Sequence, residues 1–277
     1  MSTSPTISFI GAGNMASAII GGMLDNGYKA GNIWVSAPDD AHLQSIRKRF
    51  GVSVTTDNRY CAQQADMVVL AVKPQVMADV CRDIAPVVQN TRPLMVSIAA
   101  GLTVDTLDGW LGGGLPLVRV MPNTPSLVGK GAAGLFANKD VKDNQKKMVE
   151  SVFESIGSAL WVDDENLLHG VTALSGSGPA YFFLMLEALE EVATEAGIAA
   201  DTARELAIQT MAGAAEMAAR SEHDPGQLKR KVMSPGGTTE QAINTFEAGG
   251  MRDLVRKAYK AAFKRSEEMA KELAGKQ

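Results

Sequence analysis

The stretch Ile7-Ser8-Phe9-Ile10-Gly11-Ala12-Gly13-Asn14-Met15-Ala16 decides the fold of this chain. A short apolar run ends at Gly11, and apolar residues then recur at helical spacing until Asn26-Gly27, which predicts a strand that turns directly into a helix. In a dinucleotide-binding turn the first glycine makes the tight bend and the second lets the backbone approach the pyrophosphate. A small third residue, here Ala16, allows close packing of helix on strand. A glycine-rich turn can also serve packing alone.

Further apolar segments with strand character alternate with helical segments over the first part of the chain. The expected strands cover residues 32–35, 52–54, 67–72, 94–98, 117–120, 133–137 and 159–162. This alternation predicts an α/β fold with a Rossmann-type, doubly wound parallel sheet. Ligands of such sheets lie outside the carboxyl ends of the strands, so the residues that follow each strand are candidates for a binding site.

The character of the chain changes after residue 162, where only helical periodicity remains. We therefore predict a dinucleotide-binding domain over residues 1–162 and an all-helical domain over residues 163–277. The segment 180–186 is apolar on all sides, which is typical of a helix buried on every face, and we expect a subunit interface there. A glycine-rich loop over residues 231–241 runs into a helix that Thr238 or Thr239 would cap. Its N–H groups and hydroxyls suit a small carboxylate.

Composition excludes several functional classes. The chain has 277 residues, of which 45% are hydrophobic and 21% charged, and its net charge of −4 argues against a nucleic-acid partner. Cys61 and Cys81 lack metal-binding spacing and are expected to be reduced, buried thiols. The first basic residue is Lys29, so the N-terminus lacks the positive start of a signal peptide, and no apolar run reaches membrane-spanning length. A cytoplasmic protein is expected.

Few side chains are suited to acid–base or metal chemistry. Glu165 and His169 are four residues apart, as two metal ligands could be, but no third ligand follows, so we expect structural roles and no metal. The helix expected over residues 179–196 contains no Lys, Arg or His, whereas hydroxyacid-type dehydrogenases carry a proton-transferring Lys on the corresponding helix. Reduction of a C=N bond differs, because a protonated imine already carries the charge that attracts a hydride.

Five motifs occur along the chain: Phe9-Ile10-Gly11-Ala12-Gly13-Asn14-Met15, Ala71-Val72-Lys73-Pro74-Gln75, Met121-Pro122-Asn123-Thr124-Pro125, Ala173-Leu174-Ser175-Gly176-Ser177-Gly178-Pro179-Ala180-Tyr181 and Ser234-Pro235-Gly236-Gly237-Thr238-Thr239. With these motifs in this order, the whole chain resembles the pyrroline-5-carboxylate reductases. These enzymes reduce a cyclic imino acid to L-proline with NAD(P)H, in the last step of proline biosynthesis. The last motif is the most specific of the five.

The resemblance implies three groups of cofactor-binding residues. Gly11, Gly13, Asn14 and Met15 would hold the pyrophosphate, and Ala71, Val72, Lys73, Pro74 and Ala100 would line the nicotinamide side. Asn58 matches a residue near the adenosine 2′-phosphate. Ser36 and Ala37 end the second strand, where no acid stands to bind a 2′-hydroxyl, so NADPH is favoured and NADH is the alternative. Many relatives carry a hydroxyl residue in place of Ala37, which makes the expected preference modest.

The resemblance also implies a substrate site and a partner. Ser234, Thr238 and Thr239 would bind the substrate carboxylate, with Gly237 beside them. Thr239 matches the threonine whose hydroxyl meets the ring nitrogen, which makes it the catalytic candidate, and Glu222 matches a residue close to the substrate. The helical domain of the family interlocks as a homodimer, often within a larger ring.

Two alternatives stay open at this point. The same fold serves hydroxyacid-type and other C=O dehydrogenases, which the missing Lys disfavours and a screen of small hydroxy acids would test. A non-catalytic protein that senses NADP(H) or proline is the other alternative, because fold alone does not determine function. Tight NADPH binding without turnover of any imine would favour it.

Overall fold

The computed structural model describes residues 4–274, which form two compact units. The first unit runs to Ser177 and resumes at Ala262, and the second comprises Gly178–Ala261. The functional division expected between residues 162 and 163 stays a prediction. The outer ends of the two predicted domains, residues 1–3 and 275–277, lie outside the described residues.

The first unit contains an eight-stranded sheet with the strand order β3-β2-β1-β4-β5-β6-β7-β8. Every strand expected from the sequence is present, within a few residues of its predicted bounds. The strands are β1 (Ile7–Ile10), β2 (Ile33–Ser36), β3 (Ser53–Thr55), β4 (Met67–Leu70), β5 (Leu94–Ser97), β6 (Leu117–Met121), β7 (Gly131–Ala137) and β8 (Gly157–Trp161). The prediction of a doubly wound sheet is confirmed, and its order reverses between β1 and β4.

One strand pair departs from the expected parallel arrangement. β6 and β7 are antiparallel, with Val118 opposite Ala137, whereas the other strand pairs in residues 4–274 are parallel. The reason is the length of the connection, since only residues 122–130 join these strands. A parallel crossover requires a dozen or more residues, usually a helix.

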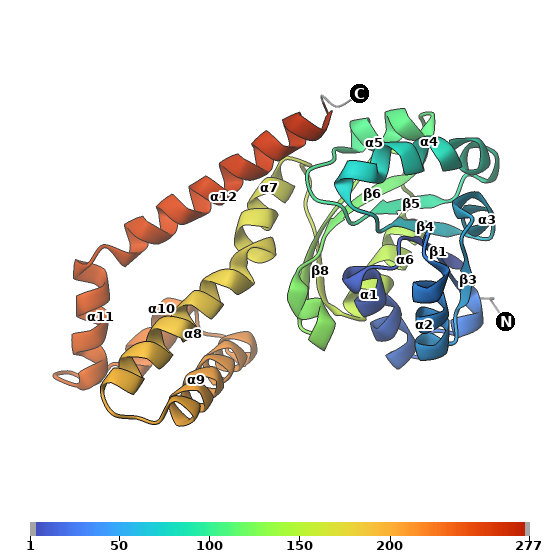
Figure 1. The fold of residues 1–277 in the computed structure, drawn as a ribbon. Helices are drawn as coiled ribbons and strands as arrows, with labels where there is room; N and C mark the ends of the chain where they lie inside the picture. Colours follow the sequence, from blue (N-terminus) through green and yellow to red (C-terminus); the bar gives the residue numbers. More distant parts are fainter. Residues whose placement is uncertain (1–3, 275–277) are drawn as a thin grey trace. The chain divides into compact units, whose positions relative to one another are not determined.

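Helices cover both faces of the sheet (Figure 1). On one face lie α1 (Asn14–Asp25), α2 (Asp40–Phe50) and α6 (Asp143–Glu154), and on the other lie α3 (Asn58–Gln63), α4 (Pro74–Thr91) and α5 (Val104–Leu111).

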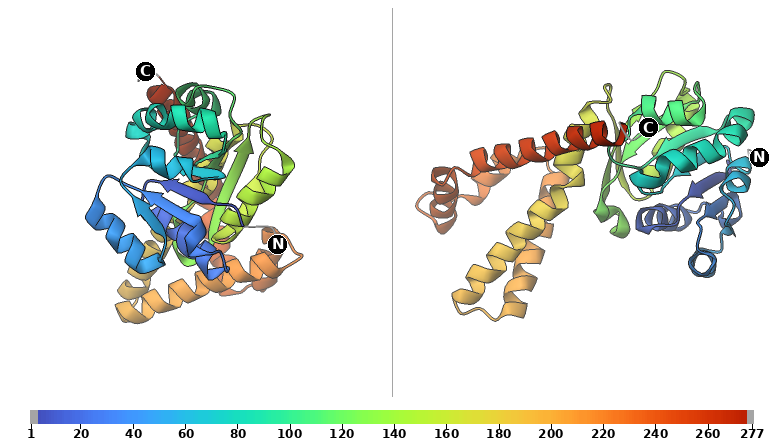
Figure 2. Two further views of the ribbon diagram at one scale, coloured as in Figure 1. Left: turned by 90° about the vertical axis from the view of Figure 1, so that its right-hand side faces the viewer. Right: turned by 45° about the horizontal axis from the view of Figure 1, so that its top comes forward.

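Cys61 and Cys81 are buried in this unit as predicted, and desolvation raises the pKa of Cys61 to about 11 and that of Cys81 to about 12. The final turns of α12 (Met251–Ala274) lie beside α5, where Leu273 packs on the core (Figure 2).

The second unit is helical. It consists of α8 (Gly178–Glu195), α9 (Ala200–Arg220), α10 (Pro225–Val232), α11 (Thr238–Ala248) and the first turns of α12. Phe182, Phe183 and Leu184 on α8 are 60%, 65% and 65% exposed in the single chain. Exposed aromatic and aliphatic surface of this kind marks a protein–protein interface. None of the helices in residues 4–274 has both the length and the apolar character needed to cross a membrane.

A buried ion pair joins the sheet to the segment before α7 (Leu167–Val171). Glu165 accepts hydrogen bonds from the Arg119 guanidinium on β6, at 2.6 Å, and from the backbone N–H of Val104 at the start of α5, at 2.6 Å. His169 on α7 bonds through Nδ1 to the Ser266 hydroxyl of α12 at 2.8 Å. Burial, and then the positive charge of Arg119, lowers the pKa of His169. Glu165 and His169 thus have structural partners, and no metal-binding cluster is found in residues 4–274.

Replacing Glu165 with Ala should destabilise the fold by about 3 kcal/mol, because it leaves the charge of Arg119 buried without a partner. The Arg119 side chain is only 7% exposed. The measurement is urea unfolding of the parent and the variant. The matched control is Asp83→Ala, which breaks an exposed ion pair with Arg59 and should cost less than about 1 kcal/mol. Equal losses in the two variants would contradict this account.

Candidate active site

The glycine turn after β1 lies where the strand order of the sheet reverses. The backbone N–H of Gly11 donates to the carbonyl of Ser36 at 2.8 Å, and that of Ala71 donates to the carbonyl of Ile10 at 2.8 Å. Gly11 has a φ of +107°, and a Cβ there would lie 2.5 Å from the Ala71 carbonyl oxygen. Only glycine therefore fits this bend. In doubly wound sheets such a reversal is where ligands bind.

Gly13 provides the open cradle that a dinucleotide phosphate needs. It is the N-cap of α1 without a side-chain cap, and a Cβ built on it would meet nothing within 4 Å. The first N–H groups of an α-helix have no partner within the helix, and such groups bind phosphate charge. Asn14 and Met15 are the first two residues of that helix. The geometry of this turn therefore fits a pyrophosphate.

A histidine that the sequence did not connect with this turn supports it from α2. His42 Nε2 lies 2.8 Å from the carbonyl oxygen of Ala12, and since a carbonyl oxygen can only accept, His42 carries a hydrogen on Nε2. The carboxylate of Asp39 caps α2 by accepting from the backbone N–H of His42, which holds the residue in place. One sequence signal could have revealed this contact. His42 lies in the first turn of the helix that follows the second strand.

Ser36 and Asn58 form a pair at the carboxyl ends of β2 and β3. The Ser36 hydroxyl, which is fully buried, donates to the side-chain oxygen of Asn58 at 2.8 Å. Asn58 is the first residue of α3 and is half-buried. This bond occupies the Asn58 oxygen and leaves the NH₂ group of the amide available as a donor. Within residues 4–274 that NH₂ group has no acceptor.

The other candidates for the cofactor side lie at the ends of the next two strands. Lys73 is the N-cap of α4, and Pro74 is the first residue of that helix. Ala71, Val72 and Ala100 are half-buried residues that follow β4 and β5. Because β1, β2, β4 and β5 are parallel neighbours, the residues at their ends share one edge of the sheet.

Asn123, in the loop after β6, serves the framework of the first unit. Its amide nitrogen donates to the carbonyl of Ser175 at 3.0 Å, and its oxygen accepts from the N–H of Ala132 at 2.8 Å. Ser175 lies in a π-helical turn, Thr172–Gly176, within the fourth sequence motif. Such turns are frequent at functional sites. Asn123 therefore fixes the motif after β6 to the motif around Ser175.

The glycine-rich loop lies in the second unit. Thr238 and Thr239 are the first two residues of α11, and the N-cap is Gly237, which has no side chain to bond. The expectation that a threonine caps this helix is therefore wrong, because the extended backbone that an N-cap requires occurs one residue earlier, at φ −83° and ψ 169°. Both hydroxyls have no hydrogen bond within residues 4–274. Glu222 is exposed in the segment between α9 and α10.

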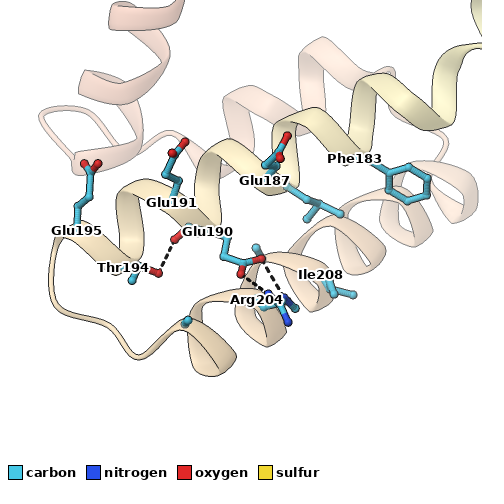
Figure 3. A pocket seen from close by; sticks show the side chains of 11 residues that line it. Phe183, Glu187, Glu190, Glu191, Thr194, Glu195, Arg204 and Ile208 are labelled. Carbon is cyan, nitrogen blue, oxygen red and sulfur yellow. Dashed lines mark hydrogen bonds and ion pairs between the residues drawn. The ribbon is translucent and has the colours of Figure 1, made fainter.

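A groove between α8 and α9 differs in character from a nucleotide site (Figure 3). Glu190 points toward α9 and forms an ion pair with Arg204, with an oxygen–nitrogen distance of 2.6 Å. Glu187, Glu191 and Glu195 on α8 also line this groove. The lining is acidic, and its cation, Arg204, is paired. This groove is therefore unsuited to phosphate or to a substrate carboxylate.

Comparisons with known proteins agree with these features. The family model described as "Pyrroline-5-carboxylate reductase dimerisation" matches residues 165–269, and the one described as "NADP oxidoreductase coenzyme F420-dependent" matches residues 6–101. A pyrroline-5-carboxylate reductase from Pseudomonas aeruginosa is 46% identical over 273 residues, which cover 99% of each chain.

Solved structures give the same result. A pyrroline-5-carboxylate reductase from Coxiella burnetii superposes with a TM-score of 0.94 at 44% identity, over 97% of this chain and 99% of its own. The Plasmodium falciparum pyrroline carboxylate reductase, solved with NADP bound, has a TM-score of 0.84 at 31% identity, over 96% of this chain and 98% of its own. Since identity of this level extends over nearly the whole sequence, the chain belongs to the pyrroline-5-carboxylate reductase family.

Proposed function

We propose that this chain reduces 1-pyrroline-5-carboxylate to L-proline, the last step of proline biosynthesis. The observation that carries the proposal is the Ser234–Thr239 motif, found with unbonded threonine hydroxyls at the start of α11 in a chain that matches the family over its full length. A nicotinamide dinucleotide, when bound, would supply the hydride that reduces the imine carbon. The two alternatives are a C=O dehydrogenase and a non-catalytic NADP(H) sensor. No feature of the site favours either of them.

The chain's own residues bind and orient the two reactants. We assign the pyrophosphate to the open turn around Gly13 and the nicotinamide side to the segments after β4 and β5. The residues concerned are Gly11, Gly13, Asn14, Met15, Ala71, Val72, Lys73, Pro74 and Ala100. Ser234, Gly237, Thr238, Thr239 and Glu222 are assigned to the substrate. Catalysis then depends on positioning, which can supply much of a rate enhancement.

The chemistry agrees with the side chains that α8 lacks. Residues 178–195 include no Lys, Arg or His, so α8 offers no cationic proton donor for a carbonyl substrate. An iminium substrate brings its own proton on the ring nitrogen, and the product amine keeps that proton. The Thr239 hydroxyl, assigned to the ring nitrogen, then orients the acceptor carbon without a change in its own protonation.

The direct test is oxidation of NADPH by the purified, folded protein in the presence of 1-pyrroline-5-carboxylate. We expect saturable turnover with this substrate, none with small 2- or 3-keto acids, and no reduction of NADP+ by the corresponding hydroxy acids. Tight NADPH binding without imine reduction would overturn the proposal in favour of a sensor. Turnover of the hydroxy acids alone would favour the C=O dehydrogenase.

We assign NADPH as the preferred cofactor and Asn58 as a residue that contacts the 2′-phosphate. Replacing Asn58 with Asp should raise the KM for NADPH about tenfold or more, because a carboxylate there would repel the phosphate. The KM for NADH, which lacks that phosphate, should change much less. Steady-state kinetics with both cofactors makes the comparison, and an equal change for the two would remove Asn58 from the 2′-phosphate site.

The assembly and the location follow from the same proposal. The apolar surface of α8 is covered by a second copy of the chain, giving a homodimer or a larger homo-oligomer in the cytoplasm. Neither a nucleic acid nor a membrane is a partner. A mass measurement in solution is expected to give a multiple of the dimer mass, and a monomer would contradict this assignment.

A further inference from the structure

The loop before α11 is a tight turn whose central peptide bond has a defined orientation. The carbonyl of Ser234 accepts from the N–H of Gly237 at 2.9 Å, Pro235 is the second residue, and Gly236 has a φ of +71°. Proline second and a glycine of positive φ third is the pattern of a type II turn. Type I and type II turns differ by a flip of the central peptide, here the one between Pro235 and Gly236. The direction of the Gly236 N–H therefore reports which form is present.

The carboxylate of Glu240 holds that N–H. Its Oε2 atom accepts from the backbone N–H of Gly236 at 2.8 Å. Glu240 is the third residue of α11, the position at which Glu or Gln reaches back to the residues before a helix in a capping box. The N-cap, Gly237, offers no side chain, so Glu240 supplies the side-chain contact that holds the loop to the helix.

This contact directs Glu240 away from the free N–H groups of its own helix. The N–H of Gly237 is bonded to Ser234, whereas those of Thr238 and Thr239 have no partner within residues 4–274. These are the groups assigned above to the substrate carboxylate. A glutamate bonded to Gly236 therefore leaves them available while it stabilises the turn that precedes them.

We propose that Glu240 is a positioning residue for substrate binding: its hydrogen bond to the Gly236 N–H holds the Ser234–Gly237 turn in the form that presents the first N–H groups and hydroxyls of α11 to the substrate carboxylate. This inference rests on the proposed function. The required property is a hydrogen-bond acceptor at this distance and not the negative charge, because Gln has an acceptor oxygen in the same place. Glu240 does not contact the reacting atoms.

The test compares Glu240→Ala, Glu240→Gln and the control Gln241→Ala in steady-state kinetics of the full chain. Gln241 is exposed on the same turn of α11, and its side chain has no hydrogen bond within residues 4–274. We expect Glu240→Ala to raise the KM for 1-pyrroline-5-carboxylate about tenfold, which is within the range that an ordinary intramolecular hydrogen bond contributes. Its kcat and its KM for NADPH should stay within about twofold of the parent. Glu240→Gln and Gln241→Ala should behave as the parent.

Three outcomes would overturn the inference. An unchanged substrate KM in Glu240→Ala would show that the contact does not serve binding, and Glu240→Gln behaving as Glu240→Ala would show that charge is what matters. If the parent protein does not reduce the imine, both the inference and the proposed function fail. The first two outcomes, by contrast, overturn only the inference, because the parent protein is active in them. Hydrogen–deuterium exchange over residues 231–241 gives a readout besides activity. Exchange should accelerate in Glu240→Ala and stay at the parent rate in Glu240→Gln.

Discussion

Replacing Thr239 with Ala is expected to lower kcat/KM for 1-pyrroline-5-carboxylate about 100-fold, the usual cost of removing one preorganised hydrogen-bond partner from a reacting group. The affinity for NADPH should be nearly unchanged. Thr239 is the half-buried second residue of α11, and its hydroxyl has no hydrogen bond within residues 4–274. Its removal therefore breaks no contact of the fold, and Ala is well tolerated in a helix. Steady-state kinetics and NADPH titration measure the two quantities.

Two controls separate the hydroxyl from the helix. Thr239→Ser keeps the hydroxyl and should retain activity within a few-fold of the parent. Thr245→Ala alters the same helix at a threonine whose hydroxyl donates to the Gln241 carbonyl at 2.9 Å. It should leave kcat/KM unchanged. Turnover by Thr239→Ala equal to that of the parent would remove Thr239 from the catalytic site.

The second large effect concerns the glycine turn, where two substitutions to Ala should fail for different reasons. Gly11→Ala places a Cβ 2.5 Å from the Ala71 carbonyl oxygen at a positive φ, so it should destabilise the fold by at least about 3 kcal/mol. Gly13→Ala places its Cβ in open space, so its free energy of unfolding should stay within about 0.5 kcal/mol of the parent. That space is where the pyrophosphate is assigned, and the dissociation constant for NADPH should rise about 100-fold.

Chemical denaturation and NADPH titration of the two variants distinguish the roles. Gly31→Ala is the matched control, because a Cβ at this exposed glycine also meets nothing within 4 Å. It should change neither stability nor binding. If Gly13→Ala bound NADPH as tightly as the parent, the pyrophosphate would have to lie elsewhere.

Local patterns were sufficient for most of the fold. Each strand of the first unit lies within a few residues of the short apolar run that predicted it. The antiparallel pairing of β6 with β7 was not predictable from the apolar runs, because they carry no direction. The threonine cap was wrong for a related reason: whether Gly237 or Thr238 takes the extended N-cap conformation depends on the turn that precedes it.

For the site, the sequence located the parts, and the tertiary structure determined how they are held. The residues of the glycine turn and of the loop before α11 were identifiable because each motif is contiguous, with its chemistry in neighbouring backbone groups. His42 with Ala12 and Ser36 with Asn58 are pairs separated by 30 and 22 residues. Such pairs form only when parallel strands bring their carboxyl ends to one edge, since the geometry of a hydrogen bond depends on the folded backbone and not on residue type.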